Sequence, residues 1–146
     1  MMENQSEPIK KEKIKLNFKD SKYATGRRKK SIAKVWVKKG SGNIHVNGLK
    51  MNEYFKRPVH QIIVTRPLEI SEVASSYDVK CSVKGGGHSG QVGAMIHGIS
   101  KALLQFDSTL KPTLKKEKLT TRDSRAVERK KYGHRKARRS FQFAKR

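Results

Sequence analysis

The spacing of apolar and polar residues predicts β-strands in the first half of the chain. Within residues 31–40, Val35 and Val37 alternate with lysine and tryptophan, which is typical of a strand with one buried face. We place Ile32 on the same buried face. Residues 44–46 contribute a second apolar pair after a turn rich in glycine and serine, and we expect the two segments to form a β-hairpin.

The second half of the chain combines one more strand pattern with helical periodicity. Residues 77–85 alternate again and predict a third strand that ends at a run of glycines. Apolar residues recur every three or four positions over residues 92–106, which predicts an amphipathic helix. Residues 110–119 can add a short helix with its leucines turned inward. Residues 57–75 are ambiguous, because Pro67 should end or kink any helix there.

The charge of the chain adds a polyanionic partner to this prediction of a small fold. The chain has 35 Lys and Arg against 12 Asp and Glu, a net charge of +23. Such an excess repels itself unless a polyanion neutralises it. Residues 115–146 hold 14 basic and 3 acidic residues, and therefore a net +11. A nucleic acid is the partner that this charge predicts, with a protein that merely has basic surfaces as the alternative.

The same patterns divide the chain into three parts. We expect residues 1–24 to be a mobile N-terminal extension, because they are polar and aperiodic. Residues 25–119 hold the alternating and amphipathic segments and should form a globular RNA-binding domain. Residues 120–146 should form an extended basic tail, which cannot bury enough apolar surface to fold without RNA.

Several function classes are disfavoured by what the sequence lacks. No apolar run approaches the ~18 residues that a membrane span needs, and the N-terminal residues resemble neither a secretory signal nor a transit peptide. Cys81 is the single cysteine, and its place in an alternating segment predicts a small buried residue rather than a disulfide or a reactive thiol. We therefore expect a protein of a reducing compartment with no membrane contact.

The glycines at positions 85, 86, 87 and 90 raise the possibility of an enzyme. Gly85, Gly87 and Gly90 fit the spacing of a dinucleotide-binding loop. That fold also needs an acidic residue at the end of a second strand, whereas Asp107 follows the predicted helix with no strand between. The five histidines form no zinc-protease motif either, so we expect no catalytic residue, cofactor or metal.

The glycines keep a simpler role in phosphate binding. Accessible backbone N–H groups and a helix N-terminus favour an anion, which in a chain of this charge is most simply a nucleic-acid phosphate. We expect Gly87 to adopt a positive φ and to let the backbone approach RNA. The alternative is that the glycines only turn the chain into the helix.

Four segments carry a resemblance to a known family. They are "TGRRKKSIAKVWV" (25–37), "RPLE" (66–69), "GGGHSGQVGAMIHGISKAL" (85–103) and "TRDSRAVERKKYGHRKARRSFQFAKR" (121–146). In this order they resemble the bacterial and organellar small-subunit ribosomal protein S-nine family over residues 25–146. The resemblance implies an α+β domain with helices on one face of a small four-stranded sheet. It also implies a left-handed βαβ crossover, as in the second domain of ribosomal protein S-five, and an extended basic C-terminal tail.

The resemblance further implies a structural constituent of the small ribosomal subunit. Its partners would be ribosomal RNA of the three-prime major domain in the subunit head, neighbouring ribosomal proteins of the head, and peptidyl-site tRNA. The compartment would be the bacterial cytoplasm or an organelle. Lys145 and Arg146 match the end of the family's tail and would contact tRNA. Phe141 departs from the family, which often has proline there.

The candidate rRNA-binding residues lie in the "GRRKKS" segment, in the glycine segment and along the tail. Arginine and lysine bind phosphate, and the tail aromatics Tyr132, Phe141 and Phe143 offer stacking faces. The candidates are Arg27, Arg28, Lys29, Lys30, Lys84, Gly86, Gly87, Ser89, Gln91, Arg122, Arg125, Arg129, Lys130, Lys131, Arg135, Lys136, Arg138 and Arg139.

Overall fold

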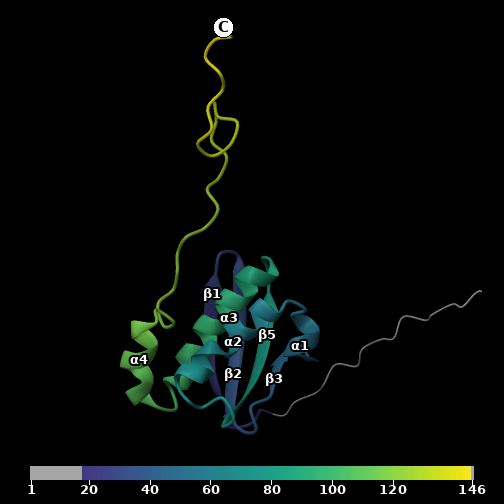
Figure 1. Ribbon diagram of the computed structural model, residues 1–146, viewed down its shortest axis with the longest axis vertical. Helices are drawn as coiled ribbons and strands as arrows, with labels where there is room; N and C mark the ends of the chain where they lie inside the picture. The colour runs from purple at the N-terminus through teal and green to yellow at the C-terminus, as the bar shows by residue number, and fades with distance from the viewer. Residues whose placement is uncertain (1–17, 146) are drawn as a thin grey trace, which may run out of the picture.

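The computed structural model describes residues 18–145 of the chain, and its strands and helices lie within residues 22–116 (Figure 1). The elements in chain order are β1 Lys22–Arg28, β2 Ser31–Lys39, β3 Ile44–Val46, β4 Leu49–Lys50, α1 Met51–Tyr54, α2 Pro58–Ile70, β5 Tyr77–Lys84, α3 His88–Leu103, the 3₁₀ turn η1 Ser108–Leu110 and α4 Lys111–Lys116. The α+β class is as expected from the sequence. Within the described part, none of the helices is long and apolar enough to cross a membrane.

The strands form one mixed sheet of five strands in the order β1-β2-β5-β3-β4. β5 pairs antiparallel with β2 and parallel with β3, so β3, the helices α1 and α2, and β5 make a βαβ unit. The sheet has one strand more than the family resemblance implies, because the two residues of β4 pair with β3. The left-handed sense of the crossover stays a prediction.

The predicted hairpin between residues 31–40 and 44–46 is wrong. These segments form β2 and β3, and β5 lies between them in the sheet. Asp78 of β5 accepts hydrogen bonds from the backbone N–H groups of Ser41 (3.0 Å) and Asn43 (2.8 Å), which carries the connecting loop across the end of β5. The hairpin partner of β2 is β1, which begins at Lys22, inside the segment we expected to be an extension. Residues 1–17 lie outside the described residues.

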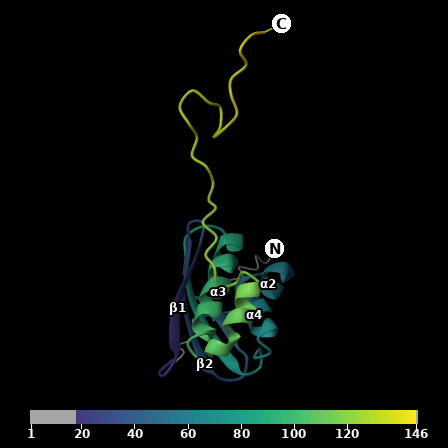
Figure 2. The same ribbon diagram turned by 90° about the vertical axis from the view of Figure 1, so that its left-hand side faces the viewer.

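The core lies between the sheet and the helices, which cover one face of it (Figure 2). Alternate residues of β2 and β5 point into the core, and α3 lays its apolar stripe across them. The buried residues of these elements include Ala33, Val35, Val37, Val79, Cys81, Val83, Val92, Met95, Ile99 and Leu103. The predicted burial of Cys81 is confirmed, at 2% exposure. Ile32 is 42% exposed, contrary to prediction, because strict alternation places Ser31 on the inner face at 1% exposure.

Helices form at the two segments with predicted helical periodicity, and one also forms in the ambiguous segment 57–75. α3 forms where the amphipathic helix was predicted, and α4 forms with Leu114 fully buried. Residues 58–70 are helical, so Pro67 lies inside α2 and the helix ends at Ile70, three residues further on. Pro67 and Leu68 are both buried, so tertiary packing keeps this last turn helical around the proline.

The C-terminal tail leaves the domain after α4 and runs away from it as an extended chain (Figures 1 and 2). A small closed loop interrupts it, in which His134 and Ser140 form an isolated antiparallel bridge. The N–H of Arg135 donates to the carbonyl of Arg139 at 2.7 Å in the same loop. The tail therefore has local structure of its own, although it adds nothing to the core.

Candidate RNA-binding site

The turn from β5 into α3 is made by the first two glycines of the segment. Gly85 and Gly86 have φ values of +74° and +61°, in the left-handed region that favours glycine. Gly87 has φ −106° and is the N-cap of α3, so the positive φ predicted for it is wrong. A Cβ on Gly86 would overlap Ser31 Oγ, whereas a Cβ on Gly87 would meet no atom within 4 Å.

Hydrogen bonds from buried side chains hold this turn against the domain. Ser31 Oγ donates to the carbonyl of Gly85 at 3.0 Å, and Gln91 Nε2 donates to the same carbonyl at 3.2 Å. Gln91 Oε1 accepts from the Tyr54 hydroxyl at 3.0 Å. Gln91 is only 9% exposed, so its side chain, which we expected to contact RNA, instead fixes the glycine turn.

The first turn of α3 faces outward at the end of this loop. α3 is 16 residues long, and no side chain caps its N-terminus. The first N–H groups of a helix have no partner within it, and the helix dipole places partial positive charge there. Gly86, Gly87 and Ser89 are exposed, so their backbone is accessible to an anion.

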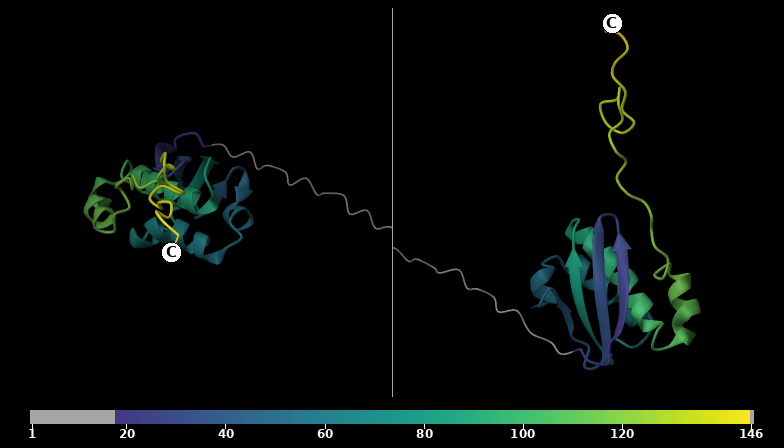
Figure 3. Two further views of the ribbon diagram at one scale, coloured as in Figure 1. Left: turned by 90° about the horizontal axis from the view of Figure 1, so that it is seen from above. Right: turned by 180° about the vertical axis from the view of Figure 1, so that it is seen from behind.

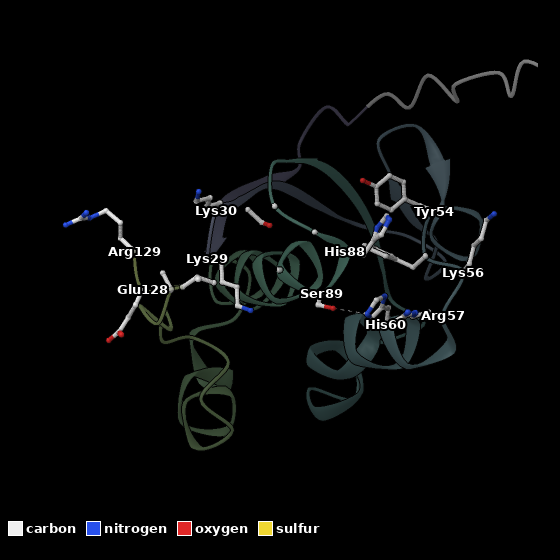
Figure 4. Close-up of a pocket in the computed structure, with 17 residues that line it drawn as sticks. Lys29, Lys30, Tyr54, Lys56, Arg57, His60, His88, Ser89, Glu128 and Arg129 are labelled. Atoms are coloured by element: carbon white, nitrogen blue, oxygen red, sulfur yellow. Dashed lines mark hydrogen bonds between the residues drawn. The ribbon is translucent and has the colours of Figure 1, made fainter. Parts of the chain in front are cut away.

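A groove of about 1240 Å³ opens over this helix start. Figure 4 shows Lys29 and Lys30 on one side of it, Lys56 and Arg57 on the other, and Ser89 between them. Arg129 of the tail adds a fifth cation, and Glu128 is the one carboxylate that lines the groove. The β1–β2 turn, the start of α2 and the tail thus present cations to one cavity, and the glycine turn adds the backbone N–H groups of the helix start.

Lys56 and Arg57 were absent from the predicted site. They lie about thirty residues before the glycines, and the parallel pairing of β3 with β5 brings the intervening helices beside the start of α3. The only local signal was a basic pair directly before a proline, at the point where α2 begins with Pro58.

Rings build the floor of the groove next to these cations. The His88 ring lies 5.7 Å from the Tyr54 ring and 5.9 Å from the Phe55 ring, in edge-to-face contact with both. His60 packs on Phe55 in the same way at 5.9 Å, and its Nε2 lies 3.4 Å from Ser89 Oγ. These contacts fix the two imidazole rings beside the helix start.

Two of the predicted RNA-binding arginines hold the root of the tail. Arg28 pairs with Asp123 at 3.1 Å and donates to the carbonyl of Arg125 at 2.5 Å. Arg125 pairs with the same carboxylate at 2.9 Å. Hydrogen bonds from the Arg125 side chain and backbone, with the nearby charge of Arg28, lower the pKa of Asp123 to about 2. We call this Arg28–Asp123–Arg125 cluster the tail anchor.

The remaining predicted residues do not converge on the groove. Arg27 and Lys84 are exposed on the face of the sheet opposite the helices. Arg138 forms a two-bond pair with Glu128, at 2.8 and 2.9 Å, which closes the tail loop. The other tail cations in the described part are exposed: Arg122, Lys130, Lys131, Arg135, Lys136, Arg139 and Lys145. Arg146 lies outside the described residues.

Together these features define a class: a basic α+β protein with a cationic groove and a cationic tail, suited to nucleic-acid phosphates. The family model for ribosomal protein S9/S16 matches residues 26–146, and the chain belongs to this family. The family is structural rather than enzymatic, and its members are RNA-binding components of the ribosome that serve translation. The protein is accordingly a structural ribosomal protein that binds ribosomal RNA.

Proposed function

We propose that this protein binds ribosomal RNA in the head of the small subunit through the groove and the proximal tail. The observation that carries the proposal is the convergence of cations from three separate segments around the uncapped start of α3. Lys29, Lys30 and Arg57 supply charge, and the helix N–H groups supply directed donors to a phosphate. The proximal tail then follows the same RNA strand with Arg129 and its neighbours.

The distal tail has a separate role in this proposal. It runs away from the domain, which supports a contact separate from the one in the groove (Figure 2). We assign peptidyl-site tRNA to this end, with Lys145 and Arg146 on the backbone of the anticodon stem-loop. Support comes from the family membership and from the exposed cation Lys145.

The protein would have other ribosomal proteins as neighbours in the subunit head. Neighbouring ribosomal proteins of the head share its RNA site, and the ribosome is that of the bacterial cytoplasm, with an organellar ribosome as the alternative. The small-subunit assignment and the tRNA contact both rest on the family. The groove geometry supports only the RNA-backbone contact.

Co-sedimentation with ribosomal subunits tests the proposal against a free-standing nucleic-acid binder. Tagged protein should sediment with the small subunit and stay there through a high-salt wash, because many contacts to folded RNA are broken only together. A variant with Lys29, Lys30 and Arg57 changed to alanine should be depleted from washed subunits. Protein that distributes over all RNA and washes off completely would contradict the proposal.

A further inference from the structure

The face of the sheet opposite the helices is left open by the described residues 18–145 (Figure 3, right). Strand register fixes which side chains share this face: Tyr23 lies opposite Trp36, and Trp36 opposite Lys80. Directly opposed residues point to the same side of a sheet. We call this surface the outer sheet face, and its residues are Tyr23, Thr25, Arg27, Ile32, Lys34, Trp36, Lys38, His45, Lys50, Asp78, Lys80, Ser82 and Lys84.

Aromatic rings lie at the end of the outer sheet face where β1 begins. The Tyr23 and Trp36 rings are 5.2 Å apart and tilted by 43°. Lys80 Nζ lies 5.9 Å from the Trp36 ring and 5.8 Å from the ring of Phe18, the first described residue. Tyr23 is 42% exposed, so its ring presents an apolar surface to solvent on a rigid strand. Such rings are suited to stack on unpaired bases.

The charge on this face selects the kind of partner. Arg27, Lys34, Lys38 and Lys84 are exposed on it, and Lys80 lies among the aromatic rings. The one carboxylate is Asp78, which lies at the end of β5 and accepts hydrogen bonds from the loop that follows β2. The occupant that complements these four exposed cations and the exposed Tyr23 ring is an anionic polymer with flat apolar groups. Its anionic groups pair with the cations, and its flat groups stack on the ring.

We propose that the outer sheet face binds a single-stranded segment of RNA. Bases stack on Tyr23 and Trp36. The side chains of Lys34, Arg27 and Lys84, which lie away from these rings along β2, β1 and β5, contact the phosphates. This contact is separate from the groove and the tail, because it uses the opposite face of the sheet. It adds a base-stacking surface on the folded domain, apart from the exposed aromatic residues Tyr132, Phe141 and Phe143 of the tail.

Trp36 is the only tryptophan of the chain, so its emission reports directly on this face. The probes are fluorescent-labelled 12-nucleotide oligouridine and oligoadenosine, titrated into the full-length protein. We expect saturable quenching of Trp36 emission at the same RNA concentration that saturates the anisotropy of the probe. Tyr23→Ala should weaken the affinity read from Trp36 by about tenfold, because stacking on an aromatic side chain is lost.

Matched charge variants locate the effect. Lys34→Ala with Lys38→Ala removes two cations from the outer sheet face, and Lys111→Ala with Lys115→Ala removes two exposed cations from α4. The first pair should weaken the quenching and the second should leave it nearly unchanged. RNA binding that saturates without any change in Trp36 emission would overturn the proposal and leave groove and tail binding intact. Absence of any RNA binding would contradict both proposals.

Discussion

Gly86 and Gly87 differ in what they contribute to the glycine loop: one turns the chain into α3, and the other leaves the backbone accessible. Gly86 makes the turn, because it has φ +61° and its Cα faces Ser31. Gly87 is open to solvent at the start of α3, and we propose that RNA approaches the backbone there. The positive φ that sequence assigned to Gly87 therefore belongs to Gly86, and the turn can be tested separately from the proposed approach of RNA at Gly87.

Serine substitutions at these two positions should have different effects on stability. Gly86→Ser should destabilise the fold by at least about 1–2 kcal/mol, the cost of a left-handed backbone at a non-glycine residue. The overlap with Ser31 adds to that cost. Gly87→Ser should change stability by less than about 0.5 kcal/mol, since the position is unobstructed and serine is a favoured N-cap. Urea unfolding of both variants checks this, and equal midpoints would contradict the two roles.

At this scale the sequence predicted residue types better than it predicted their partners. Gln91 and Arg28 lie in segments that we expected to bind RNA, yet Gln91 is turned inward and Arg28 is paired with Asp123. Hydrogen-bond capacity can be read from a side chain, whereas its partner depends on which distant segment lies opposite. Asp123 lies 95 positions after Arg28 in the chain, and no local pattern marks the pair.

Among the elements, the tail anchor connects the β1–β2 hairpin to the C-terminal tail. Arg28 ends β1 and binds Asp123 and the carbonyl of Arg125, so residues 126–129 pass along the groove. The direction of the proximal tail is thereby set before RNA is bound. The loss of conformational entropy when the tail becomes ordered on RNA should therefore fall mainly on its distal part.

Neutralising Asp123 should release the proximal tail. In Asp123→Asn, Arg28 and Arg125 lose their shared charge, and residues 126–129 should show faster backbone motion in ¹⁵N relaxation measurements on the free protein. Glu128→Gln is the matched control, because it breaks the pair with Arg138 further along the tail and leaves the anchor in place. Unchanged relaxation in Asp123→Asn would mean that the anchor does not hold the tail.

The pH dependence of the anchor follows from the lowered pKa of Asp123. The folded value of about 2 lies below the ordinary 3.8, so the anchor is fully charged above 3.8 and is lost as the pH falls through about 2. Carboxyl ¹³C shifts of Asp123 should therefore show no titration between neutral pH and 3.8. A midpoint near the ordinary value would show that the pairing is absent in solution.

Element order was the part of the fold that periodicity could not supply. Alternation in β2 and β5 identified the strands and most of their inward residues, because the period of two depends only on one strand. Which strands are neighbours depends on loops and on the core. The Asp78 contacts that lead the chain past β5 are hydrogen bonds from a side chain to backbone groups 35 or 37 positions away. No local pattern marks such contacts, so the sequence could not distinguish a β2–β3 hairpin from the observed β2–β5 pairing.

At the scale of the whole molecule, charge is spread over two structural parts with different tasks. The domain supplies the groove and the outer sheet face, and the tail carries cations away from the domain. A net charge of +23 on 146 residues makes association with RNA strongly dependent on ionic strength. Anchoring on the subunit and contact with tRNA should thus be separable by mutation.

Deleting Lys145 and Arg146 should leave incorporation into subunits nearly intact, because two of 35 cations are lost. The same deletion should increase the dissociation rate of peptidyl-site tRNA by up to about tenfold, since a charged hydrogen bond to phosphate contributes roughly 1.5–3 kcal/mol before solvent screening. The measurement compares subunits with full-length and shortened protein at equal occupancy. Equal rates would withdraw the tRNA assignment for the tail end and leave the groove assignment standing.

The most direct test of the central claim is the salt dependence of binding to a head-domain fragment of the ribosomal RNA. Full-length protein should lose affinity steeply, by ~10³–10⁵ between 50 and 200 mM salt for 6–10 phosphate contacts. The groove variant Lys29→Ala, Lys30→Ala and Arg57→Ala should reduce the slope of log affinity against log salt by about 2–3. The α4 variant Lys111→Ala, Lys115→Ala and Lys116→Ala removes the same charge and should leave the slope almost unchanged. Equal slopes for the groove and α4 variants would contradict a phosphate-binding groove.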